Sequence, residues 1–114
     1  MKKILYKSIH SSKSTNDGIR ICVMRKIRPE YDFDLWIPKL APSEKLLELY
    51  VINKKISWKE FKKKYQKQIL VKEKKLIKIL NILLLNNSIT LLCGEQSPNH
   101  CHRILIGKEL IKIK

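Results

Sequence analysis

The order of strand and helix signals constrains the fold of this chain more than any single motif does. Two short apolar segments near the start, residues 4–9 and 19–24, have the alternation that is typical of strands. A helical region at residues 43–85 separates them from a third apolar segment, SITLLCG at residues 88–94, and a last helix is expected from about residue 99 to 111. This order predicts an α/β fold: a small three-layer domain with a largely parallel sheet flanked by helices.

Local signals place several helix ends. Ser43 can cap the segment EKLLELYV, and Ser57 with Glu60 three residues later matches a capping box. A further helix is expected at residues 72–85, whereas the prolines of residues 25–42 predict irregular structure there. The aromatic residues behind Ser57 share one helical stripe and are expected to face the core: Trp58, Phe61 and Tyr65.

The chain has 114 residues, which suits a single domain spanning residues 1–114. Its longest apolar run, residues 79–85, is far shorter than the roughly 20 residues of a membrane-spanning helix, and the start lacks a signal-peptide pattern. We therefore expect a cytoplasmic protein with no membrane partner. Three cysteines cannot form a disulfide framework without leaving one over, so all three should be reduced, with Cys22 a small buried hydrophobe.

The net charge of +15 has two interpretations. It favours a nucleic acid or another anionic partner. It is also what a lysine-rich, isoleucine-rich and asparagine-rich composition produces on a surface that is merely solvated. Charge alone leaves both open.

The segment LLCGEQSPNHCHRIL, residues 91–105, is the candidate site. Cys93 should end a parallel strand, and ligands in open α/β sheets bind beyond such strand ends. Cys101, His102 and Arg103 should begin the last helix, where the helix dipole favours anions and thiolates and a guanidinium can bind phosphate or carboxylate. Arg25 ends the second predicted strand, so Arg25 and Cys93 are expected to face one shared hollow.

Other chemistries for this segment are weaker. A transition metal at Cys93, Cys101 and His102, with His100 as a further ligand, is a minor alternative, because the spacing lacks a CxxC pair; the sequence itself requires no cofactor. A phosphatase-type loop is excluded by the cysteine-to-arginine spacing and the missing turn glycines. Each cysteine also has a purely structural alternative, Cys93 as a buried strand end and Cys101 as packing at the helix start.

Four motifs in order resemble the family catalogued as domain of unknown function 488. The C-terminal TLLCGE…HCHRILI is similar to the family signature, and DGIRICVMR, the D-L-W and LAPS segments and the W-x-x-F-x-x-x-Y helix are similar to its earlier motifs. The resemblance covers about residues 17–110. Where family members commonly have Pro-Arg-Gly, this chain has Arg28-Pro29-Glu30.

The resemblance implies a compact α/β fold and a pocket, but no particular reaction. Transferred position by position, it implies these functional residues: Arg25, Asp34, Trp36, Ser43, Cys93, His102 and Arg103.

The first functional hypothesis is an enzyme or binding protein for a small anionic, nucleotide-like ligand. Arg25 and Arg103 would hold the anion, with Asp34, Trp36 and Ser43 as further ligand-binding candidates. The catalytic candidates are a reactive thiol and a proton carrier: Cys93, Cys101 and His102.

The second hypothesis is a nucleic-acid-binding accessory protein. Residues 54–78 carry eleven lysines against two glutamates, and such a helical face would neutralise phosphates without reading sequence. The residues expected on this face are Lys59, Lys62, Lys63, Lys64 and Lys67.

Overall fold

The computed structural model of the protein describes residues 2–95 and 100–112. Within them, four parallel strands form one sheet in the order β1-β4-β2-β3. Their bounds are β1 (Ile4–Ser8), β2 (Ile19–Cys22), β3 (Leu35–Trp36) and β4 (Ile89–Cys93). The three expected strands are present. The two-residue β3 lies in the segment that was expected to be irregular. The sequence did not predict this strand, because two residues are too few to produce an alternation.

The helical region is less regular than its pattern suggests. Two 3₁₀ turns, η1 (Thr15–Asp17) and η2 (Pro38–Leu40), precede it. Helix α1 (Glu44–Leu47) continues into the π-helix η3 (Glu48–Ile52), α2 (Trp58–Tyr65) continues into the π-helix η4 (Gln66–Leu70), and α3 (Lys74–Leu84) and α4 (His102–Lys112) follow. Among the residues that the structure describes, no helix has both the length and the apolar character needed to cross a membrane.

The predicted caps at Ser43 and Ser57 are confirmed in atomic detail, whereas the helix expected from residue 72 begins at Lys74, and the start expected at about residue 99 lies outside the described residues. The Ser43 hydroxyl accepts the Leu46 N–H at 3.1 Å. The Ser57 hydroxyl accepts the Glu60 N–H at 3.2 Å, and the Glu60 carboxylate accepts the Ser57 N–H in return. Each bond satisfies a backbone donor that the first helical turn leaves without an intrahelical partner.

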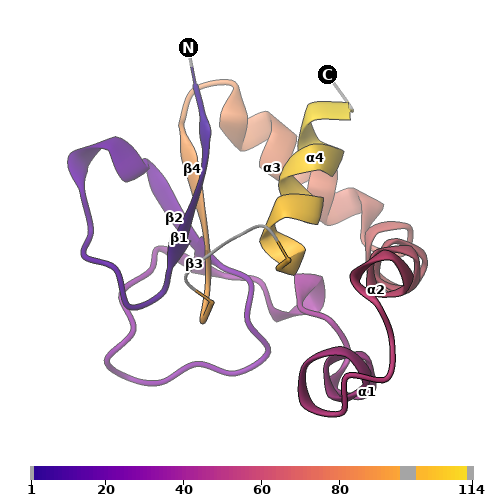
Figure 1. The fold of residues 1–114 in the computed structure, drawn as a ribbon. Helices are drawn as coiled ribbons and strands as arrows, with labels where there is room; N and C mark the ends of the chain where they lie inside the picture. The colour runs from indigo at the N-terminus through magenta and orange to yellow at the C-terminus, as the bar shows by residue number, and fades with distance from the viewer. Residues whose placement is uncertain (1, 96–99, 113–114) are drawn as a thin grey trace.

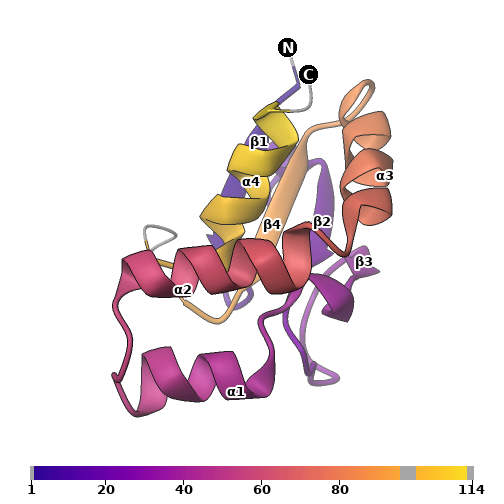
Figure 2. The ribbon, with the colours of Figure 1, turned by 90° about the vertical axis from the view of Figure 1, so that its right-hand side faces the viewer.

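The α/β fold with a parallel sheet is confirmed. The helices pack on one face of the sheet, and the opposite face is covered by connecting loops (Figures 1 and 2). Ile21 and Leu91 point toward the helices and join the larger core, which includes the predicted aromatic residues Phe61 and Tyr65. The side chains of Cys22 and Leu92 point to the other face, into a smaller core with Ile9, Tyr31 and Phe33. Loops thus form the third layer in place of helices.

A buried ion pair holds the loop-covered face together. Arg20 Nη1 donates to Asp17 Oδ2 at 2.7 Å, and both side chains are almost fully buried. Lys7 Nζ lies 3.1 Å from Asp17 Oδ1. Burial raises the pKa of Asp17, but hydrogen bonds from Arg20, Ser14 and Lys7 outweigh it and lower the pKa to about 2. The carboxylate is therefore charged throughout the physiological range.

Parallel pairing brings the carboxyl ends of the strands to one edge of the sheet. Ser8 lies opposite Cys93 in the β1–β4 register, and Cys22 lies opposite Leu92 in the β2–β4 register. The residues that follow β2 and β4 consequently meet at this edge, where ligands bind in open α/β sheets.

Candidate active site

A cavity of about 610 Å³ lies at this edge of the sheet. Met24 and Arg25 from the end of β2 line it, together with Cys93 and Gly94 from the end of β4. The α1–η3 segment, Phe61 of α2 and the residues at the start of α4 complete the wall. Arg25 and Cys93, which the sequence placed at one hollow, thus line the same cavity. Its volume lies within the range of ordinary small-molecule sites.

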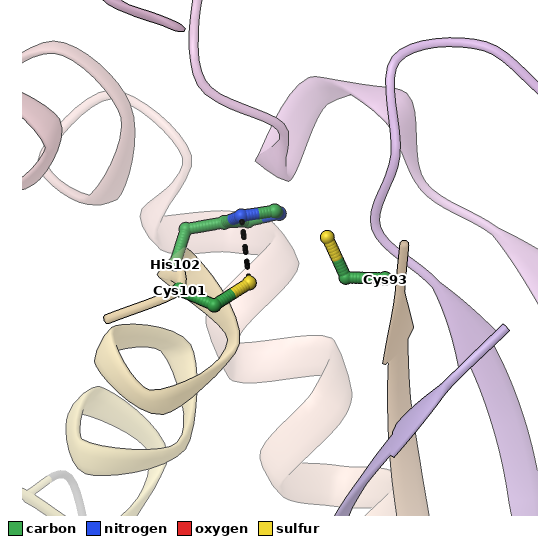
Figure 3. A group of neighbouring side chains, drawn as sticks. All are labelled: Cys93, Cys101 and His102. Atoms are coloured by element: carbon green, nitrogen blue, oxygen red, sulfur yellow. Dashed lines mark hydrogen bonds between the residues drawn. The ribbon is translucent and has the colours of Figure 1, made fainter. Parts of the chain in front are cut away.

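Two cysteines and a histidine gather in this cavity. Cys93 extends from the end of β4 toward Cys101 and His102, which stand at the start of α4 (Figure 3). The two sulfurs and a ring nitrogen of His102 all lie within 4.8 Å of one another. Cys101 is 5% exposed and Cys93 is partly exposed, so both sulfurs border the cavity from largely buried positions.

The hydrogen bonds of His102 define which ring nitrogen carries a proton. Its Nε2 lies 2.8 Å from the carbonyl oxygen of Val23, which can only accept, so Nε2 must carry hydrogen and donate. Its Nδ1 lies 3.6 Å from the Cys101 sulfur. In the neutral ring Nδ1 therefore has a free lone pair directed at Cys101 and can take the proton of that thiol.

The guanidinium of Arg103 is fully buried and fixes the sulfur of Cys101 in place. Nε donates to Cys101 Sγ at 3.3 Å, Nη1 donates to the Lys7 carbonyl at 2.5 Å, and Nη2 donates to the Glu95 carbonyl at 2.8 Å. The end of β1, the segment after β4 and the start of α4 are tied together through this one side chain. Arg103, expected to bind an anionic ligand, instead directs these donors at the protein.

These contacts separate the two cysteines electrostatically. A hydrogen bond from Cys93 lowers the pKa of Cys101 strongly; burial opposes this, and the hydrogen bond and charge of His102 add to the lowering. The same hydrogen bond to Cys101, together with burial, raises the pKa of Cys93. The lower pKa therefore belongs to Cys101 and the higher pKa to Cys93, so that Cys101 is the more readily ionised of the two thiols.

The remaining predicted ligand-binding residues occupy different places. Arg25 lines the cavity, with its side chain 42% exposed and 3.9 Å from the Glu44 carboxylate. Three others do not line it and have structural contacts. The Asp34 carboxylate accepts the backbone N–H of Arg20 at 2.8 Å, Trp36 Nε1 donates to the Met24 carbonyl at 2.8 Å, and Ser43 caps α1.

The cavity also contains residues outside the predicted set of catalytic and ligand-binding residues. Lys26 and Lys54 add positive charge beside Arg25, and Glu44 and Glu95 add negative charge. Tyr50 and Phe61 supply an aromatic wall, their ring centroids 4.8 Å apart, and His100 stacks on Trp58 at 5.0 Å. Adjacency to Arg25 could have indicated Lys26. Lys54 reaches the site only through the fold of the η3–α2 connection, for which the sequence has no signal.

The sulfur–nitrogen cluster also has the donor set for a soft metal ion. Two cysteine sulfurs and one imidazole nitrogen suit zinc, and the Val23 carbonyl on Nε2 leaves Nδ1 as the ligand atom. These three side chains could therefore hold one ion beside the cavity.

The lysines of the second hypothesis lie on the outside of α2 and η4. Lys59, Lys63, Lys64 and Lys67 are exposed and Lys62 is half-buried. In the part of the chain that the structure describes, none of the five forms an ion pair within 4.0 Å.

A family model described as the active DUF488-N3 subclade (DUF488-N3a) matches residues 4–114. Neither the curated proteins nor the solved structures gave a significant match.

Proposed function

Because this chain belongs to the DUF488 family, within the subclade described as active, we propose that its cavity is an active site in which Cys101 is the nucleophile. The substrate would be a small anionic molecule with an electrophilic centre. The observation that carries the proposal is the pair of nitrogens around one sulfur, Arg103 Nε, which donates at 3.3 Å, and His102 Nδ1 at 3.6 Å, at the wall of a cavity of about 610 Å³.

The three consecutive residues have separate roles in this proposal. Nδ1 of His102 takes the Cys101 proton, and the imidazolium so formed can return a proton to the leaving group of the substrate. The Val23 carbonyl keeps the ring in the required tautomer. Arg103 acts through Cys101 as a positioning residue, because its guanidinium orients the sulfur and favours its negative charge.

The cationic side chains of the cavity support an anionic substrate. Arg25, Lys26 and Lys54 outnumber Glu44 and Glu95, and the net charge of +15 would attract anions from a distance. The aromatic wall suits a planar group attached to the anion, as in a nucleotide. The structural contacts of Asp34, Trp36 and Ser43 leave them with supporting roles.

Alkylation by iodoacetamide, followed for each cysteine by mass spectrometry between pH 3 and 9, tests the nucleophile. We expect Cys101 to react faster than Cys22 and Cys93 at neutral pH and to keep reacting well below the ordinary pKa of a thiol. Buried Cys22, whose pKa burial raises, is the internal control. A Cys101 that reacts only at alkaline pH would remove the proposal.

A matched pair of reagents tests the anion preference. Iodoacetate and iodoacetamide deliver similar carbon electrophiles, but only iodoacetate is charged. We expect the ratio of their Cys101 rates to favour iodoacetate at low salt and to fall severalfold in Lys54→Gln. The matched control is Lys64→Gln, an exposed lysine of α2 that does not line the cavity. Equal ratios in all three proteins would contradict anion binding.

The lysines on the outside of α2 and η4 favour a second candidate, binding of nucleic acid through its phosphates. Binding of a short DNA or RNA duplex should weaken steeply as salt rises. Replacing Lys59, Lys63 and Lys67 with Gln should weaken it and reduce the salt dependence. No binding at low salt would eliminate this candidate.

A further inference from the structure

We infer that Cys93 and Cys101 form a redox-active pair, in which a hydroperoxide oxidises Cys101 and Cys93 resolves the product into a reversible disulfide. The inference rests on the proposed function to the extent that both use Cys101 as the nucleophile. It adds a second substrate class, small hydroperoxides, and a role for Cys93 that the proposed chemistry does not need.

The position of the two sulfurs supports the pairing. They lie no more than 4.8 Å apart, on two elements that meet at one edge of the sheet: Cys93 ends β4, and Cys101 immediately precedes α4 (Figure 3). The two sulfurs of a disulfide are about 2 Å apart, so the sulfurs of Cys93 and Cys101 need to move closer to each other by less than about 3 Å. Both residues line the cavity, which gives a small peroxide access to them.

The first step is balanced by groups already at the site. The Cys101 thiolate attacks one oxygen of the hydroperoxide, an S–O bond forms and the O–O bond breaks. The departing alkoxide or hydroxide takes the proton held on Nδ1 of His102 and leaves as alcohol or water. Cys101 is thereby oxidised by two electrons to a sulfenic acid, and the peroxide is reduced by the same two.

The second step uses the neighbouring thiol. The sulfur of Cys93 attacks the sulfenic sulfur of Cys101, so that an S–S bond forms and the S–O bond breaks. Hydroxide leaves with the thiol proton of Cys93 as water.

The surroundings favour the reduced state, which would make the disulfide labile. The thiolate accepts from Arg103 Nε and His102 Nδ1, and the disulfide loses the negative charge that both donors stabilise. A pair whose reduced form is stabilised in this way has an easily reduced disulfide. A small dithiol should therefore restore both thiols, with its own oxidation supplying the two electrons.

The test treats the intact protein with one equivalent of hydrogen peroxide and then maps its thiols by mass spectrometry. We expect the monomer to become lighter by two hydrogen atoms, the three free thiols to fall to one, and a peptide linkage between Cys93 and Cys101 that dithiothreitol reverses. Cys22→Ser is the matched control and should form the same linkage. In Cys93→Ser, the sulfenic acid of Cys101 should persist and be trapped by a cyclic 1,3-dione.

Alkylation of Cys101 is measured in the same samples, which separates the two proposals. Rapid alkylation without a Cys93–Cys101 disulfide, or sulfenic acid that accumulates equally in the wild type and Cys93→Ser, would overturn the inference and leave the proposed nucleophile standing. A linkage that involves Cys22 would also overturn it. A Cys101 that neither alkylates nor oxidises would overturn both.

Discussion

Replacing His102 with Gln should shift the ionisation of Cys101 toward the ordinary thiol range. Gln can donate hydrogen bonds through its amide group but cannot take up the Cys101 proton or carry positive charge. The imidazole Nδ1 lies 3.6 Å from the sulfur, and the charge and hydrogen bond of His102 both lower the pKa of Cys101. The substitution removes the charge and weakens the hydrogen bond, so it directly perturbs the proposed thiolate.

The size of the shift follows from two contributions. A hydrogen bond to a charged group contributes about 1.5–3 kcal/mol, and two charges about 4 Å apart near a protein surface attract by about 4 kcal/mol. The two contributions overlap, because a hydrogen bond to a charged group already contains part of the charge attraction, so the loss is about 1.5–4 kcal/mol. One pKa unit corresponds to about 1.4 kcal/mol, so we expect the pKa of Cys101 to rise by about one to three units.

The assay is the pH dependence of Cys101 alkylation by iodoacetamide. The inflection of the rate should move to higher pH in His102→Gln, while the plateau above it remains. The matched control is His100→Gln, which makes the same substitution in the same cavity outside the cluster of Cys93, Cys101 and His102. Urea unfolding shows whether either variant is folded. If the two folded variants share the wild-type inflection, His102 does not set the state of the thiol and the reasoning fails.

Two further predictions concern the fold. Asp17→Asn removes the partner of buried Arg20 and should lower the free energy of unfolding at pH 7 by about 3–5 kcal/mol, measured in urea. The pKa of Asp17 in the folded protein is about 2, below the ordinary 3.8, so the stabilisation by this carboxylate is complete above about pH 4 and is lost as the pH falls toward 2. The Asn variant should lack this part of the loss of stability in acid. An identical loss of stability in acid for both proteins would contradict the prediction. Gly18→Ala should destabilise by about 1–3 kcal/mol, because Gly18 has a φ of +64° and a methyl group would overlap the Ser88 carbonyl. Gly94→Ala, whose methyl would lie 3.6 Å from Met24, is the control, and equal melting temperatures would refute the argument.

The parts of the fold that local patterns determine were predictable. The strands β1, β2 and β4 and the caps at Ser43 and Ser57 depend on neighbours within a few residues. The parallel pairing of β2 with β4 follows from the helices between them in the sequence, and it brings Arg25 and Cys93 to one edge. The loop layer on the opposite face was missed, since it depends on contacts such as Arg20 with Asp17, which no periodic pattern displays.

The place of the candidate site was therefore predictable, but not the partner of each side chain. Arg103 is the clearest case. Its residue type suits anion binding, yet its Nη1 reaches the Lys7 carbonyl, 96 positions away in the sequence. Asp34 and Trp36 differ from the expectation in the same way, because a polar side chain satisfies backbone groups as readily as a ligand and only the fold determines which is nearer.

The two buried arginines have different partners. The pair of Arg20 with Asp17 is structural, whereas the pair of Arg103 with Cys101 is a candidate for chemistry. Arg20 faces Asp17 on the loop-covered side of the sheet, and a carboxylate with a pKa of about 2 stays charged and unreactive. Arg103 faces the sulfur of Cys101 beside the cavity. A guanidinium holds either anion in a fixed place, but a thiolate is also a strong nucleophile. The cost of burying Arg20 is thus offset by the permanent charge of Asp17. In the proposed function, the cost of burying Arg103 is offset by the charge of a Cys101 thiolate, which the reaction consumes.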